Sequence, residues 1–257
     1  MESQHVDAVT AELESEFSQA LADGDLDAVQ RLTTSAPQLL SGSALTIAAF
    51  WGHVGVLDYL VSRGCDLAFR GKDGYTALHE AARSCKPSVE LFEILLRHGA
   101  DVNAEAEGGL RITPLHVLLN GGYLDEDRRR IADRLLHHGA KINSIAEAVA
   151  LGKSQIALQM VENGMPLDDF LFPSERTALH VAAILGDVAV ISKLTCLGKP
   201  WLDAEDWEHK TALDLAGTEE IRQVLRLAGA RTSDEVWSEI NSAADQADAV
   251  IRLLSKL

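Results

Sequence analysis

The sequence is poor in aromatic residues and cysteine, and it has no long hydrophobic run. Phenylalanine, tryptophan and tyrosine together make up 5% of its 257 residues. The three cysteines, Cys65, Cys85 and Cys196, are odd in number and widely spaced. This pattern excludes a disulfide framework and favours a reducing compartment. No run of apolar residues reaches the ~18 that a transmembrane helix needs, so we expect no membrane span.

Basic residues are also scarce. The chain has 23 Lys and Arg against 39 Asp and Glu, which gives a formal net charge of −16. A nucleic-acid-binding surface needs clustered basic residues, and an anionic membrane repels an acidic chain. We therefore expect a partner that is neither nucleic acid nor membrane. The first residues, Met1 to Asp7, lack the basic and apolar regions of a signal peptide, and we expect a monomeric cytoplasmic protein.

What the sequence does contain is one motif repeated in phase. Its fullest copy begins at Thr177 and reads Thr-Ala-Leu-His-Val-Ala-Ala-Ile-Leu-Gly-Asp. Other copies begin at Ser43, Thr76, Thr113 and Thr211. Successive starts lie 33, 37, 64 and 34 residues apart, and the gap of 64 leaves room for two units of 32. A second signal, a glycine that ends an apolar helical pattern, recurs at similar intervals, as in His98-Gly99-Ala100.

These two motifs resemble the ankyrin repeat from about Phe17 to about Ala230. The resemblance implies an all-α solenoid, in which each repeat has two antiparallel helices and a short hairpin-like loop. The residues support this fold independently. Thr177 can cap the helix that it opens, and Ala182 and Ala183 are small enough for two helices to approach closely. One helix pair cannot bury its apolar side alone, so the repeats must stack.

The repeat register predicts three parts of the chain. A helical cap and a degenerate first repeat occupy residues 1–42, about six repeats occupy 43–230, and a second helical cap occupies 231–257. The fifth repeat, which begins at Ser144, has lost the segment for its hairpin and the T-x-L-H box. The fourth repeat carries a five-residue insertion around Tyr123 to Asp127.

Sequence signals for catalysis or metal binding are absent. No phosphate-binding glycine loop, zinc-ligand spacing or nucleophile elbow occurs. His79, His116 and His180 share one position of the repeated motif, which favours a structural role. The acids between Asp203 and Glu208 lack the ligand spacing and the glycine of a calcium loop. We therefore predict no catalysis, no cofactor and no metal.

Partner binding is the function that the resemblance implies. Aromatic side chains are typical of binding hot spots, and the repeat register places several at first-helix ends and hairpin tips of the concave surface. Their alternative role is packing between neighbouring repeats. The candidate partner-binding residues are Phe50, Trp51, Lys72, Asp73, Tyr75, Arg83, Arg111, Asn120 and Trp207.

We predict a protein–protein interaction module without catalytic activity. The sequence does not name the protein partner, although the acidic charge favours a basic one. Two alternatives stay open. One is an immunity or inhibitor protein that masks a basic toxin or enzyme with its acidic surface. The other is an enzyme with a pocket beside the irregular fourth and fifth repeats.

Overall fold

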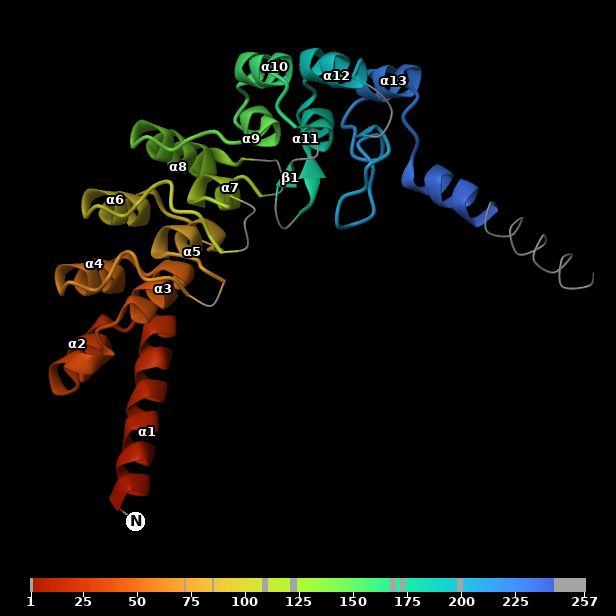
Figure 1. Cartoon of the computed structure of the whole chain (residues 1–257). Coiled ribbons are helices and arrows are strands. Elements are labelled where there is room, and N and C mark those ends of the chain that lie inside the picture. Colours follow the sequence, from red (N-terminus) through yellow and green to blue (C-terminus); the bar gives the residue numbers. More distant parts are fainter. Residues whose placement is uncertain are drawn as a thin grey trace, which may run out of the picture. The chain divides into compact units, whose positions relative to one another are not determined.

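The computed structural model describes residues 2–71, 73–84, 86–107, 111–120, 124–166, 170–171, 174–197 and 201–242, with side chains from residue 12 onward. Lys72 and Cys85, which the sequence analysis singled out, lie outside the described residues. The chain divides into two compact units, Met1–Leu118 with Leu124–Ile142, and Leu119–Tyr123 with Asn143–Leu257. We call them unit 1 and unit 2, and Figure 1 shows the helices of each.

Unit 1 consists of stacked helix pairs with the bounds α1 (Glu2–Asp23), α2 (Leu26–Ser35), η1 (Pro37–Leu39), α3 (Gly42–Trp51), α4 (Val54–Ser62), α5 (Ala77–Arg83), α6 (Val89–Arg97), α7 (Pro114–Leu118) and α8 (Glu126–His137). The helices α3, α5 and α7 form an inner row, in which α5 packs between the other two (Figure 1). A second row contains α4, α6 and α8. Each repeat joins one helix of each row, as α3 with α4 and α5 with α6.

Unit 2 has the same architecture, with α9 (Ile145–Ala150), α10 (Ser154–Glu162), β1 (Phe170–Leu171), β2 (Arg176–Thr177), α11 (Ala178–Leu185), α12 (Val188–Thr195), α13 (Glu219–Ala228) and a helical segment over 233–242. The strands β1 and β2 form a two-stranded antiparallel sheet, in which Phe170 pairs with Thr177 and Leu171 with Arg176. Apart from this short hairpin, the regular elements in the described parts of both units are helices, so the predicted all-α repeat solenoid is confirmed. None of the described helices has the length and hydropathy that a membrane crossing requires.

The repeated threonines and histidines open the inner helices. Thr76 caps α5 and Thr177 caps α11, and in both helices the Nδ1 of the histidine three residues later accepts a hydrogen bond from the threonine amide at 3.2 Å. This reciprocal pairing satisfies backbone donors that the start of a helix leaves free. Ala81 and Ala82 are fully buried, and their small side chains allow α3 and α5 to pack closely.

The fifth repeat keeps a capped helix although its sequence has lost the T-x-L-H box. Ser144 Oγ accepts a hydrogen bond from the Glu147 amide at 3.0 Å, and the buried Glu147 carboxylate accepts one from the Asn143 amide at 2.6 Å. Asp214, three residues after Thr211, takes the position of the histidine, and its Oδ2 accepts a hydrogen bond from the Thr211 amide at 2.9 Å. The T-x-L-H box is absent here, and an acid bonds to a backbone amide where other repeats use histidine.

Four loops place a residue in the left-handed region two residues before the threonine that opens the next copy of the motif. Gly74 occupies this position two residues before Thr76, with φ of +72°, and an added Cβ there would lie 2.4 Å from the Glu107 amide nitrogen. In three other loops the same position holds a non-glycine residue at positive φ, namely Arg111 (50°), Glu175 (55°) and His209 (58°). Such a residue costs about 1 kcal/mol or more relative to an unstrained backbone. Each of these three residues therefore lowers the free energy of unfolding by occupying its loop tip.

Candidate protein-interaction site

An aromatic cluster lies where α3 and α5 pack together in unit 1. Phe50 and Trp51 end α3, and their rings meet edge to face with centroids 5.3 Å apart. The guanidinium carbon of Arg83, the last residue of α5, lies 5.0 Å from the Phe50 ring centroid and 5.7 Å from the Tyr75 ring centroid. We call these four residues together with Glu80 the aromatic–arginine cluster.

Arg83 is positioned by charge as well as by the two rings. Its Nη2 and Nε donate hydrogen bonds to Glu80 Oε2 at 2.8 and 3.2 Å. The Arg83 side chain is nevertheless 50% exposed, so the guanidinium is oriented and still open to a partner. Glu80 is the member that the sequence analysis missed. An acid three residues before an arginine on the same helix was the signal that could have found it.

The aromatic members of the cluster differ in exposure. Trp51 is 44% exposed, whereas Tyr75 is 8% exposed. The Tyr75 ring stacks on the His79 ring with centroids 5.1 Å apart, and burial raises the pKa of the Tyr75 hydroxyl. Tyr75 therefore acts as a packing residue that supports Arg83, and Trp51 presents the apolar surface.

The remaining candidate residues lie elsewhere in the two units. Asp73 and Arg111 are exposed loop residues of unit 1. Asn120 and Trp207 belong to unit 2, where both bind the backbone of Ser174. The Asn120 Oδ1 accepts from the Ser174 amide at 3.2 Å, and the Trp207 amide donates to the Ser174 carbonyl oxygen at 3.1 Å. The structure thus assembles part of the predicted set into one cluster.

The recurrent histidines bond to the protein's own backbone. The Nε2 of His79 donates to the Ile112 carbonyl oxygen at 3.0 Å, and the Nε2 of His180 donates to the Lys210 carbonyl oxygen at 3.0 Å. Each bond ties the start of an inner helix to the loop of the next repeat. Burial lowers the pKa of His79 to about 4 and also lowers the pKa of His180. Both imidazoles are therefore neutral at neutral pH.

Removal of metal ions is expected to leave the stability of the protein unchanged. His79 and His180 engage both ring nitrogens in hydrogen bonds, so neither offers a free lone pair to a metal. The described residues also contain no group of three or more metal-ligating side chains. Thermal unfolding followed by circular dichroism with and without EDTA measures the effect. A clear drop in the midpoint on chelation would reveal a metal site.

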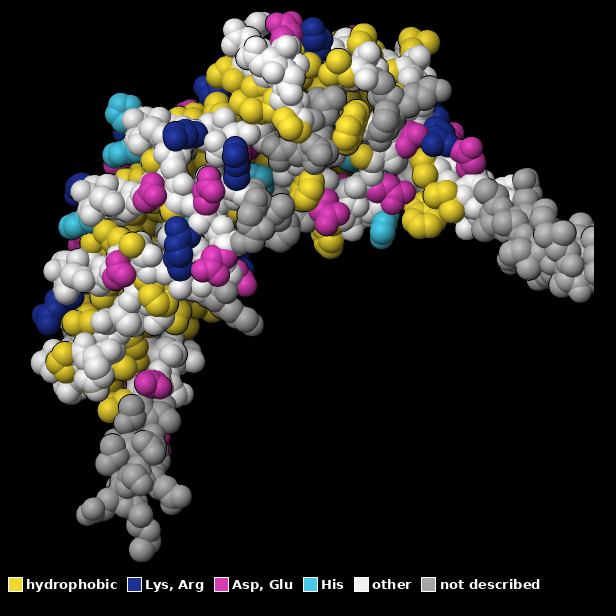
Figure 2. Space-filling view, viewed as in Figure 1, with side chains coloured by type: hydrophobic (Ala, Val, Ile, Leu, Met, Phe, Trp, Pro, Cys, Tyr) yellow, Lys and Arg dark blue, Asp and Glu magenta, His cyan; other side chains and the backbone are white. Residues whose placement is uncertain are grey.

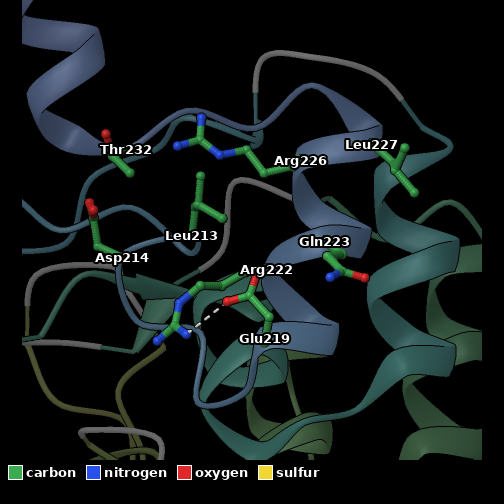
Figure 3. Close-up of a pocket in the computed structure, with 8 residues that line it drawn as sticks. All are labelled: Leu213, Asp214, Glu219, Arg222, Gln223, Arg226, Leu227 and Thr232. Carbon is green, nitrogen blue, oxygen red and sulfur yellow. Dashed lines mark hydrogen bonds and ion pairs between the residues drawn. The ribbon is translucent and has the colours of Figure 1, made fainter.

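A pocket of about 680 Å³ lies in unit 2 beside α13 (Figure 3). Its charged side chains are engaged within the chain, because Glu219 pairs with Arg222 at 3.4 Å and Arg226 pairs with Glu235 at 2.6 Å. The lining residues are Leu213, Asp214, Glu219, Arg222, Gln223, Arg226, Leu227 and Thr232.

Asp214, one of the two acids that line this pocket, has a structural role. Burial acts to raise the pKa of Asp214, but hydrogen bonds from Thr211 and Ser233 outweigh burial and lower the pKa. An ionised carboxylate that already accepts three hydrogen bonds is a poor general base. The pocket lies beside α13, whereas the enzyme alternative expected one beside the fourth and fifth repeats.

Comparison with known proteins relates this geometry to a family. Residues 17–106 match the family model for ankyrin repeats in three copies. The chain is 35% identical over 101 residues to human ankyrin repeat and KH domain-containing protein 1. It is 38% identical over 78 residues to the NF-kappa-B inhibitor cactus of Drosophila melanogaster. These matches cover 39% and 30% of this chain but 4% and 14% of the two relatives, so the chain spans a small part of either.

A solved structure extends the likeness to most of the chain. The crystal structure of the human ASB11 ankyrin repeat domain aligns with 84% of this chain and 98% of that domain, at 24% identity and a TM-score of 0.50. This likeness shows the fold. Residues 17–106 therefore contain ankyrin repeats, and the chain has the ankyrin-repeat fold. Ankyrin repeats are in general protein–protein interaction modules, and this is the class of function that the family defines.

Proposed function

We propose that this chain binds a protein partner through the aromatic–arginine cluster of unit 1. The observation that carries the proposal is the exposed Trp51 ring against Phe50, together with Arg83, whose guanidinium contacts the Phe50 and Tyr75 rings. Tryptophan and arginine are among the residue types most enriched in binding hot spots. A side chain that is ordered before binding also loses little conformational entropy when the partner arrives.

Each member of the cluster has a separate part in this proposal. Trp51 offers a flat apolar surface that a partner side chain can bury. Arg83 uses Nε and Nη2 for Glu80, so its Nη1 remains for a carboxylate or carbonyl oxygen of the partner. Phe50 supports both residues, through the edge contact with Trp51 and the cation–π contact with Arg83.

Trp51→Ala is expected to weaken partner binding by about 2 kcal/mol, or roughly thirtyfold. The partner would be captured with the full chain from the native host, identified and purified, and titrated calorimetrically against both forms. Ile156→Ala is the matched control, because Ile156 is an apolar residue of α10 in unit 2 that is 37% exposed. It should change the binding free energy by less than about 0.5 kcal/mol. Unchanged affinity for Trp51→Ala, or an equal loss for the control, contradicts the proposal.

An inhibitor role is the second candidate. The name of the fly relative describes an inhibitor, and the net charge of −16 fits a basic target. Opposite charges across an interface accelerate association, and salt screens this attraction. A basic target enzyme should therefore lose activity in a one-to-one complex, with an association rate that falls as salt is added. A captured partner that is acidic, or one whose activity does not change, argues against this role.

A further inference from the structure

The long loop after α12 in unit 2 ends in an ordered tip that exposes a tryptophan. The buried Asp206 carboxylate accepts hydrogen bonds from the amides of Glu208 and Lys210, each at 3.0 Å. The Trp207 amide donates to the Ser174 carbonyl oxygen at 3.1 Å, so the backbone is fixed on both sides of the tip. Trp207 itself remains 60% exposed. A tryptophan needed only for the core would be buried, so this exposure calls for another reason.

The last described helix, residues 233–242, adds a second exposed apolar face. Trp237 and Ile240 lie about one turn apart on this helix, and they are 45% and 50% exposed. The Trp237 ring meets the His209 ring edge to face with centroids 6.3 Å apart, so the helix adjoins the loop tip. Figure 2 shows hydrophobic side chains around the start of this helix. We call Trp207, His209, Trp237 and Ile240 the tryptophan surface.

Ion pairs fix this helix to the rest of unit 2. Arg226 pairs with Glu235 at 2.6 Å, and Arg231 pairs with Asp203 at 2.8 Å and also with Glu239. The tryptophans on the loop and on the helix are therefore presented by two anchored segments. Such preorganisation favours binding, because less conformational freedom is lost when a partner docks.

Carboxylates that lack an internal counter-ion border the tryptophan surface. Glu208 directly follows Trp207, and Glu175 directly follows Ser174, whose carbonyl oxygen binds the Trp207 amide, so the two acids occupy neighbouring loop tips. Both are exposed, and neither forms an ion pair within the described part of the chain. Glu205, in the same loop as Glu208, adds a third carboxylate, which differs from these two because its Oε2 lies 3.1 Å from the His209 Nδ1. This border favours a positively charged partner.

We propose that the tryptophan surface is a second docking site and that it binds a basic amphipathic helix of another protein. Apolar side chains of that helix would cover Trp207 and Trp237, and its lysine or arginine side chains would meet the bordering carboxylates. A second copy of this acidic chain is a poorer occupant, because like charges repel. Glu175 and His209 also occupy a strained position where an equivalent loop has Gly74, and strain of this kind clusters at functional sites. The site is independent of the function proposed for unit 1.

Calorimetric titration with a synthetic amphipathic helix of leucine and lysine tests this proposal on the full chain. The peptide should bind the unaltered protein, and its counterpart with glutamate in place of lysine should not. Trp207→Ala and Trp237→Ala should each weaken binding roughly tenfold or more. Glu175→Gln combined with Glu208→Gln should weaken binding and reduce its salt dependence. These two exposed acids can be neutralised without touching the core, so this variant also covers the case in which a tryptophan variant misfolds.

Ile156→Ala is the control, because Ile156 is an exposed apolar residue of unit 2 outside the tryptophan surface, and its loss should leave this titration unchanged. The proposal is overturned if the lysine peptide does not bind, or if the glutamate peptide binds equally well. It is also overturned if Ile156→Ala weakens binding as much as Trp207→Ala, since the loss would then not be specific to the tryptophan surface. Sedimentation that shows a dimer abolished by Trp207→Ala would instead assign the surface to a second copy of the chain.

Discussion

Leu78→Ala is expected to lower the free energy of unfolding by about 2–5 kcal/mol. Leu78 is fully buried in α5, which packs between α3 and α7, so truncation leaves a cavity in the middle of unit 1. In stacked repeats such a loss weakens one repeat and both of its interfaces, because stability is a sum of repeat and neighbour contributions. Urea unfolding followed by circular dichroism measures the difference.

Trp51→Ala is the matched comparison for this measurement. Trp51 is 44% exposed, and the ring contact that it loses is the edge contact with Phe50. We therefore expect a loss of less than about 1 kcal/mol in unfolding free energy, together with the loss of partner affinity described above. If Trp51→Ala unfolded as readily as Leu78→Ala, Trp51 would be a packing residue and the role proposed for it would be wrong.

Mild acid is expected to destabilise the protein through its buried histidines. The pKa of His79 is lowered by burial to about 4, below the ordinary 6.5, so the unfolded chain takes up the proton first. The stability that depends on neutral His79 is fully present above pH 6.5 and is lost as the pH falls towards 4. Between about pH 7 and about pH 5 the loss should be about 2 kcal/mol. His180 acts in the same direction, because burial lowers its pKa too.

His79→Gln provides the control for this pH dependence. Glutamine at this helix position can keep the bond to the Thr76 amide but does not titrate. The variant should be less stable than the original protein at about pH 7, because it loses the bond from Nε2 to the Ile112 carbonyl oxygen. Its urea-unfolding free energy should nevertheless fall less between about pH 7 and about pH 5. An equal fall in both proteins would mean that other groups cause the acid sensitivity.

The helix starts could be predicted because their signals are local. Thr76 and His79 lie within one helical turn, and the capping box that they form depends little on the rest of the chain. Ser144 and Glu147 also accept hydrogen bonds from backbone amides at the start of α9, but with different residue types, which a search for one motif overlooks. The border between the units was not predicted, since it depends on contacts among whole repeats.

The candidate site could be predicted only in part. Phe50 and Trp51 were expected at the end of a first helix, and they end α3. Trp51 and Tyr75 could not be distinguished from the sequence, because the exposure of each side chain is set by neighbouring repeats. The structure separates them at 44% and 8% exposure. Glu80 was not predicted because it acts by orienting Arg83. This role becomes clear only from the structure, in which Arg83 also contacts two aromatic rings.

The sequence by itself determined that this chain is a repeat protein with helices opened by short capping motifs. Those properties follow from residues that lie within one turn or one period of each other. Only the tertiary structure decided that Arg83 lies between Phe50 and Tyr75, and that His209 meets Trp237. These contacts join different helices and loops, and their geometry depends on how the repeats stack, which no local pattern of residues specifies.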